Sequence, residues 1–136
     1  VVNASHRLAR AAAVSFAELR DEDFIGFPAD VGTDLPAVLR GLCRQAGFEP
    51  RIVQTAREAT TQIGLVGAGL GVAVLPAPLE TVRMARVRYL PITDAEAQFR
   101  LAVATVKGAP SPLLQGFLDV VDGVIERPAA QPQPQQ

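Results

Sequence analysis

The chain has 136 residues, of which 49% are hydrophobic and 20% are charged. This composition excludes a disordered chain and suits one globular domain with a modest core. The formal net charge is −1 and Lys107 is the only lysine among 13 basic residues, so no basic face for nucleic acid is expected. No apolar run reaches the roughly 18 residues of a membrane span, so no membrane partner is expected either.

The first part of the sequence predicts a short helical turn and then a strand. Ser15 and Glu18 have the spacing of a capping box, so a turn is expected over residues 16–20. Phe24–Phe27 is a short apolar run that indicates a strand. Pro28 ends this strand because proline cannot donate to a sheet ladder.

A helix is predicted next. Pro36 suits its first turn, where a missing N–H costs nothing, and Gly47 suits the position just past its end. Cys43 also falls at an apolar spacing and, as the only cysteine, is expected to be a small core residue with no disulfide. Five apolar residues recur at helical spacing and form one face: Leu35, Val38, Leu39, Leu42 and Ala46.

The rest of the sequence continues to alternate strands with helices. Such alternation predicts an α/β layer with a mainly parallel sheet. The Pro/Gln-rich residues 127–136 are expected to form a disordered tail. The other expected elements are strands at 51–54, 72–75, 87–92 and 100–106, a helix at about 59–68, and a last helix that Ser111 caps.

Two loops follow predicted parallel strands, at the sheet edge where such folds bind ligands. They span residues 28–33 and 54–58. In the second loop, the Thr55 hydroxyl, the Arg57 guanidinium and free backbone N–H groups could converge on an anion. The alternative is that Thr55 only caps a helix and Arg57 points into solvent. Similarly, Phe27–Pro28 either supplies an apolar wall or only ends its strand.

The glycine-rich segment 63–76 does not match a dinucleotide-binding loop. Glycine occupies the first and third positions of 67–71, but Val72 stands where the sixth position needs glycine. The predicted order here is also helix then strand, whereas a phosphate-binding glycine loop follows a strand and begins a helix. The glycines are therefore expected to let a helix pack closely on a strand.

No catalytic or metal-binding constellation is evident. His6 is the only histidine and Cys43 the only cysteine, so the sequence has no spacing of residues that is typical of metal ligands. Any Ser-His-Asp triad would have to use His6. We therefore expect a protein that is not an enzyme and that uses no cofactor or metal.

The order of these segments resembles the effector-binding domain of LysR-type transcriptional regulators, over about residues 4–125. The segments that carry the resemblance are Phe24–Pro28, Leu42–Phe48, Pro50–Gln54, Gly64–Pro76, His6–Ala9, Val14–Leu19, and Leu101–Val106 with Ser111–Leu114. The resemblance implies an α/β fold like type II periplasmic binding proteins, with two subdomains and a small-molecule cleft between them.

In that arrangement the chain corresponds to one subdomain, with the first subdomain largely missing. Residues 1–9 would be a hinge or crossover segment, 10–107 the second effector-binding subdomain, 108–126 the C-terminal helix and 127–136 the tail. The N-terminal winged helix-turn-helix would also be absent. That the chain begins with valine suits a piece of a larger protein.

The resemblance further implies the sensing part of a cytoplasmic bacterial regulator. A small-molecule effector, such as a carboxylate or an aromatic acid, would bind in the cleft and modulate transcription. The parent would be a homodimer or homotetramer and would contact DNA only through the missing helix-turn-helix. The alternative is a fragment of a solute-binding protein of an uptake system, which shares this fold.

The resemblance also assigns roles to individual residues. Gly64, Gly67 and Gly71 become packing positions between helix and strand. The effector contacts implied for this chain are Phe27, Pro28, Ala29, Gln54, Thr55, Ala56 and Arg57.

Overall fold

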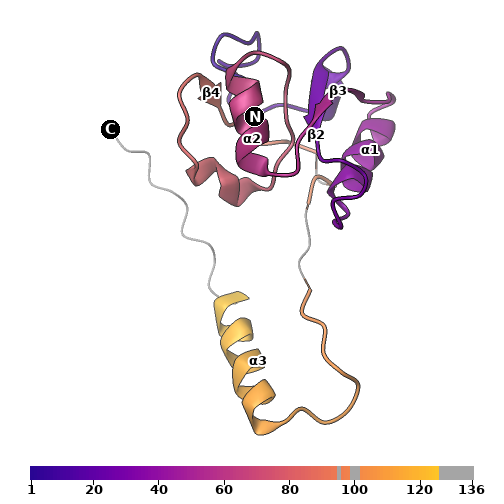
Figure 1. Ribbon diagram of the computed structural model, residues 1–136, viewed down its shortest axis with the longest axis vertical. Coiled ribbons are helices and arrows are strands. Elements are labelled where there is room, and N and C mark those ends of the chain that lie inside the picture. The colour runs from indigo at the N-terminus through magenta and orange to yellow at the C-terminus, as the bar shows by residue number, and fades with distance from the viewer. Residues whose placement is uncertain (95, 99–101, 126–136) are drawn as a thin grey trace. The chain divides into compact units, whose positions relative to one another are not determined.

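The computed structural model describes residues 1–94, 96–98 and 102–125. The chain divides into two compact units, Val1–Arg100 and Leu101–Gln136 (Figure 1). The tail expected at 127–136 lies outside the described residues.

The first unit is built on a short parallel sheet between two helices (Figure 1). Strand β2 (Asp23–Gly26) pairs in parallel with β3 (Arg51–Thr55). Helix α1 (Leu35–Gln45) connects the two strands, and α2 (Ala59–Gly67) follows β3. The sequence predictions for these four elements are confirmed to within a residue or two, as expected where apolar periodicity is strong.

Neighbouring residues of β2 point into two different cores. Phe24 is fully buried in a cluster that includes Leu42 of α1. The next residue, Ile25, is buried in a second cluster with Val66 of α2 and Ala73. Since successive strand side chains face opposite ways, this alternation gives α1 and α2 opposite faces of the sheet.

The apolar face predicted for α1 is confirmed. Leu39, Leu42 and Cys43 are buried, and Val38 and Ala46 pack against the same cluster. The cluster extends past the helix, where the rings of Phe24 and Phe48 lie 6.2 Å apart. Tilted aromatic pairs at this separation add to the stabilisation from buried area.

Helix α1 ends as the sequence predicts. Gly47 has φ 81° and its N–H donates to Arg44 O at 3.0 Å, while Phe48 N–H donates to Cys43 O at 3.0 Å. This pair of bonds is a Schellman motif, which satisfies carbonyls that the helix end leaves free. Arg20 donates a further bond to Ala46 O at 3.1 Å.

Short elements complete the first unit. The Ser15 N–H donates to Glu18 Oε2 at 2.9 Å, as a capping box requires, at the start of the expected turn. β1 (Val2–Asn3) and β4 (Val87–Arg88) form a separate antiparallel pair. The unit also contains the 3₁₀ helices η1 (Phe16–Leu19) and η2 (Ala77–Thr81).

Three expected strands differ in the structure. The segment 72–75 is not a continuous strand: Val72 forms an isolated bridge to Phe24, and Ala73 exchanges two backbone hydrogen bonds with Val1, at 2.7 and 3.0 Å. The strand expected at 87–92 is reduced to β4 with a separate bridge at Ile92. Residues 102–106 form no strand, and residues 100 and 101 lie outside the described part. An alternating pattern suits a strand but does not supply a partner, and no described residue pairs with 102–106.

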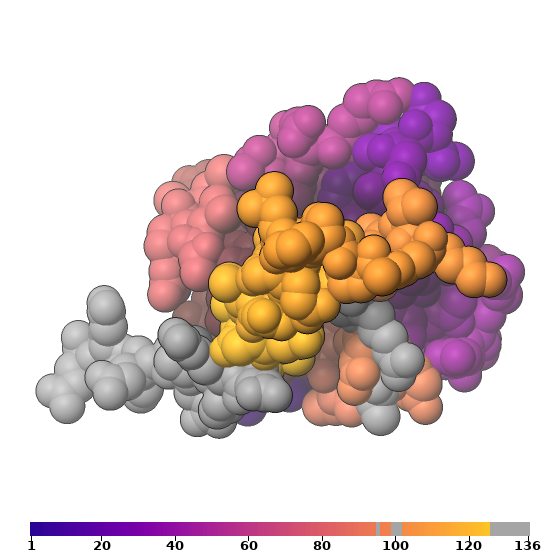
Figure 2. Space-filling model, turned by 90° about the horizontal axis from the view of Figure 1, so that it is seen from below, coloured from indigo at the N-terminus to yellow at the C-terminus, as the bar shows by residue number. Residues whose placement is uncertain are grey.

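The second unit contains helix α3 (Pro112–Ile125), which Figure 2 shows in orange and yellow. Ser111 begins it as predicted, because its Oγ accepts the Leu114 N–H at 3.3 Å. Among the described residues, no helix has both the length and the apolar character that crossing a membrane requires.

The glycines after residue 63 have different roles. A Cβ on Gly64 would meet only Met84 Sδ at 3.9 Å, and one on Gly67 would meet Ala85 O and Val87 Cγ1 at 3.4 Å. A Cβ on Gly71 would lie 2.4 Å from Asp23 O. The helix–strand packing that the sequence suggested is present at Gly67, because Val87 belongs to β4. The closest approach, at Gly71, is between two backbones beside β2.

We expect Gly71→Ala to destabilise the protein by about 1–3 kcal/mol, because the added methyl group must push two paired backbones apart. Gly64→Ala is the matched control. It adds the same methyl group within α2, where space is available, and should be neutral or stabilising by up to ~1 kcal/mol. Urea unfolding measures both, and equal stability of the two variants would contradict the role of Gly71.

Cys43 provides a second check on the core. Burial, with a smaller contribution from the charge of Glu49, raises the pKa of its thiol to about 11. Because the thiolate is the reactive form, a thiol reagent at pH 8 should modify the folded protein more than about tenfold more slowly than the urea-unfolded protein. Equal rates would show that Cys43 is accessible in the folded state.

Candidate functional site

A small pocket lies at the carboxyl ends of β2 and β3. Its volume is about 80 Å³. Ligands in open parallel sheets bind at this edge, outside the ends of the strands. The residues that line the pocket are Gly26, Phe27, Pro28, Ala29, Leu35, Pro36, Leu39, Arg40, Ile52, Thr55 and Val74.

Strand register brings the two predicted loops together. Gly26 lies opposite Thr55 in the parallel pair, so the residues that follow each strand leave the sheet side by side. The Ala56 N–H then donates to Gly26 O at 3.0 Å, which continues the pairing past the end of β3. The backbone of the second loop is thus fixed against the end of β2.

Helix α1 supplies another wall of the pocket. Leu35, Pro36, Leu39 and Arg40 stand at positions i, i+1, i+4 and i+5, which lie along one side of a helix. Leu39 is buried in the core cluster, while Arg40 is exposed. The wall therefore changes from apolar to cationic.

Four of the seven residues predicted to contact an effector line this pocket: Phe27, Pro28, Ala29 and Thr55. Gln54 and Ala56 flank Thr55 but do not line the pocket, consistent with side chains that alternate along an extended segment. Ala56 takes part through its backbone. Arg57 does not line it either.

Arg57 is engaged by a residue that the sequence did not suggest. Its guanidinium nitrogen lies 2.5 Å from Asp30 Oδ2, so an ion pair joins the two loops. Both side chains are largely exposed, at 60% and 70%, and such pairs contribute at most about 1 kcal/mol. The side chain of Arg57 is thus largely exposed, as one of the two sequence alternatives expected, and it also pairs with the neighbouring loop.

Gln62 of α2 donates a hydrogen bond to the second loop. It is fully buried in α2, and its Nε2 donates to Ala56 O at 2.9 Å. Its Oε1 has no partner among the described residues. Sequence reasoning missed this residue, although a glutamine four positions before the buried Val66 falls on the apolar side of the helix, where a polar side chain needs a bonding partner.

The only histidine and cysteine have other partners. His6 Nε2 lies 3.0 Å from Glu22 Oε2, and its Nδ1 accepts the Leu8 N–H at 3.2 Å. Partial burial would raise the pKa of Glu22, but the hydrogen bonds from His6 and Arg7 lower it overall. Cys43 lies in the core cluster. Within the described residues, no three His, Cys, Asp or Glu side chains are placed to hold a metal ion.

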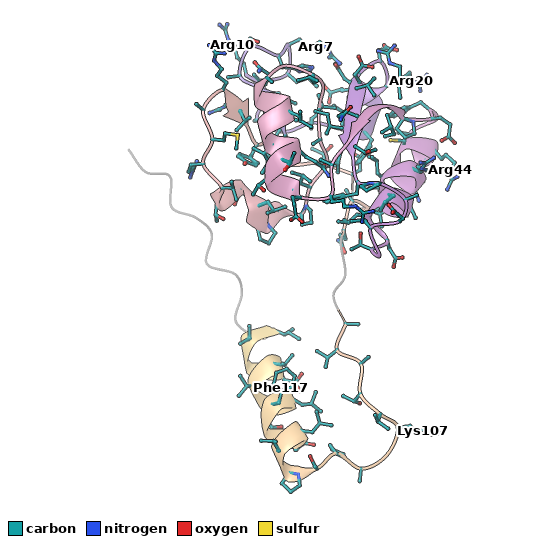
Figure 3. All side chains as sticks on the ribbon, in the orientation of Figure 1. Arg7, Arg10, Arg20, Arg44, Lys107 and Phe117 are labelled. Carbon is teal, nitrogen blue, oxygen red and sulfur yellow. The ribbon has the colours of Figure 1, made fainter. Side chains whose placement is uncertain are left out.

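Four arginines of the first unit are labelled in Figure 3, and one of them is held by an ion pair. Arg7, Arg10, Arg20 and Arg44 are labelled in Figure 3 at separate places around it. Arg7 is paired with Glu22 at 2.7 Å. The expectation of no basic face for nucleic acid rests on the net charge of −1 and the single lysine, and it stays a prediction.

We expect Gln62→Leu to loosen the loop that carries Thr55. The substitution removes the donor to Ala56 O and leaves that carbonyl unpaired, which costs about 1–2 kcal/mol. Backbone amides at residues 55–58 should exchange hydrogen faster, and Thr60→Val, an exposed change on the same helix, should leave them unaffected. Unchanged exchange in Gln62→Leu would show that the loop does not depend on this bond.

Comparison with known proteins identifies relatives over most of the chain. The uncharacterized HTH-type transcriptional regulator YnfL of Escherichia coli (strain K12) is 44% identical over 92 residues, which cover 68% of this chain and 31% of that protein. The chain spans about a third of the length of the first curated relatives it matches.

Solved structures agree with this relationship. The BenM effector binding domain, solved with its effector benzoate, aligns with a TM-score of 0.64 and 28% identity over 71% of this chain and 44% of that one. The effector binding domain of QuiR in complex with shikimate aligns with a TM-score of 0.65 and 20% identity over 87% of this chain and 56% of that one, which supports the fold.

These neighbours share the α/β fold of type II periplasmic binding proteins that the sequence predicted. The family model described as "LysR substrate binding domain" matches residues 1–125. The expected resemblance is confirmed: this chain belongs to the LysR substrate-binding domain family.

Proposed function

We propose that this chain is the effector-sensing part of a LysR-type transcriptional regulator and that a small molecule binds against the pocket at the ends of β2 and β3. The observation that carries the proposal is the convergence of both predicted loops on this one pocket. The alternative of an uptake protein gains no support, because the matched curated relatives are transcriptional regulators.

The pocket is one wall of a larger site. Complete small-molecule sites enclose about 300–1,000 Å³, whereas this pocket has about 80 Å³. We assign residues 1–9 to the hinge, 10–107 to the second effector-binding subdomain, 108–126 to the C-terminal helix and 127–136 to a tail. The first subdomain, elsewhere in the full-length protein, would supply the opposite wall.

Regulation then follows from binding between two walls. An effector that contacts both favours the closed arrangement and shifts the population toward it, and the DNA-bound oligomer responds to that shift. The chain itself has a binding role and not an enzymatic one. DNA contact belongs to a helix-turn-helix outside these residues, in a cytoplasmic homodimer or homotetramer.

Thr55→Val tests the site. Valine has nearly the same shape but lacks the hydroxyl, so it removes one hydrogen bond to the effector and should weaken effector affinity about tenfold. A thermal-shift screen of small carboxylates and their neutral amides on the full-length protein identifies a ligand, and titration calorimetry measures its affinity.

Thr60→Val is the matched control, because Thr60 is exposed and does not line the pocket. DNA affinity without ligand should be the same in both variants and in the unmodified protein. Effector affinity equal in Thr55→Val and Thr60→Val would remove Thr55 from the site. A full-length protein whose DNA binding responds to no ligand would overturn the proposed function.

A further inference from the structure

Two arginines lie close to the pocket, and only one of them forms an ion pair within the described residues. Arg57 is paired with Asp30 across the two loops. Arg40 lines the pocket, is exposed, and has no hydrogen bond or ion pair with any described residue. The guanidinium that is free to meet a ligand is therefore that of Arg40.

Helix geometry keeps Arg40 beside the pocket and away from the nearest acid on its own element. Arg40 shares one side of α1 with Pro36, four residues earlier, and both line the pocket. Asp34, at the start of α1, is six positions from Arg40, which places it on a different side of the helix, and it does not line the pocket.

The other residues that line the pocket indicate which chemical groups the rest of the ligand carries. Thr55 offers the only hydroxyl of the lining, and the side chains other than those of Thr55 and Arg40 are apolar. One cation and one hydroxyl beside an apolar surface match a molecule with a single negative end and a compact apolar body. A planar guanidinium forms two parallel hydrogen bonds with a carboxylate, which selects that group over a neutral amide.

We propose that Arg40, and not Arg57, recognises the negative charge of the effector, which is a small carboxylate with an apolar body. This inference rests on the proposed function, because it concerns the same pocket. Arg40 reads the charge, Thr55 adds a hydrogen bond, and the apolar lining contacts the body. The Asp30–Arg57 ion pair persists when the effector binds and contributes no net charge to the site.

Calorimetry on the full-length protein with benzoate, shikimate and carboxylate hits from the screen tests this assignment, and each carboxylate is compared with its neutral amide. Unmodified protein should bind a carboxylate at least about tenfold more tightly than its amide. Arg40→Gln should lose that preference, because a charge-assisted pair is worth about a tenfold change in affinity or more. Arg40→Lys should retain part of it.

Two controls isolate Arg40 from general charge effects. Arg44 is exposed one turn further along α1 and does not line the pocket, so Arg44→Gln removes the same charge without touching the site (Figure 3). The double variant Asp30→Asn with Arg57→Gln removes the ion pair without changing net charge. Both should bind the carboxylate as the unmodified protein does, and all variants should share one unfolding midpoint in urea.

The outcomes separate this inference from the proposed function. Unchanged carboxylate affinity in Arg40→Gln, with weakened affinity in Thr55→Val, would overturn the role of Arg40 and leave the function in place. Tighter binding of the amide than of its carboxylate would overturn the ligand class in the same way. If the unmodified protein binds no member of the screen, the proposed function and this inference both fail.

Discussion

The pairing of β2 on both of its edges is the constraint on which the first unit depends. Phe24 lies between Ile52 of β3 and Val72, and Asp23 O accepts the Val72 N–H at 2.8 Å. Because β2 presents Phe24 to one core and Ile25 to the other, the strand fixes both helices at once. The close approach at Gly71 is what allows this third segment to lie against β2.

The same pairing places the site. Three parallel segments that run side by side must end at one edge, so the residues that follow them meet there whatever their own side chains prefer. Gly26, Thr55 and Val74 all line the pocket for this reason. The pairing of the strands therefore decides which loops are neighbours at the candidate site.

Local patterns predicted the elements well, and long-range placement explains what they missed. Helix α1 and strand β2 follow from apolar spacing within a few residues, and the α/β class follows from the order of the elements. Residues 102–106 alternate as well as any strand, yet a ladder needs a partner that the pattern cannot specify. The sequence offered no reason to select Arg40, because an arginine on a helix usually faces solvent; its place in the pocket lining depends on where α1 lies relative to the strand ends.

The loop after β3 is held mainly by uncharged hydrogen bonds, which salt does not screen. The Asp30–Arg57 pair is exposed and would be screened, but the Ala56 backbone is bonded on both sides, to Gly26 O and from Gln62. The residue after Thr55 is therefore held by two hydrogen bonds that do not involve the ion pair. A wall ordered before binding loses little entropy when a ligand arrives. If the proposed function holds, the free energy of effector binding then favours the movement between subdomains, because little of it is needed to order a loop.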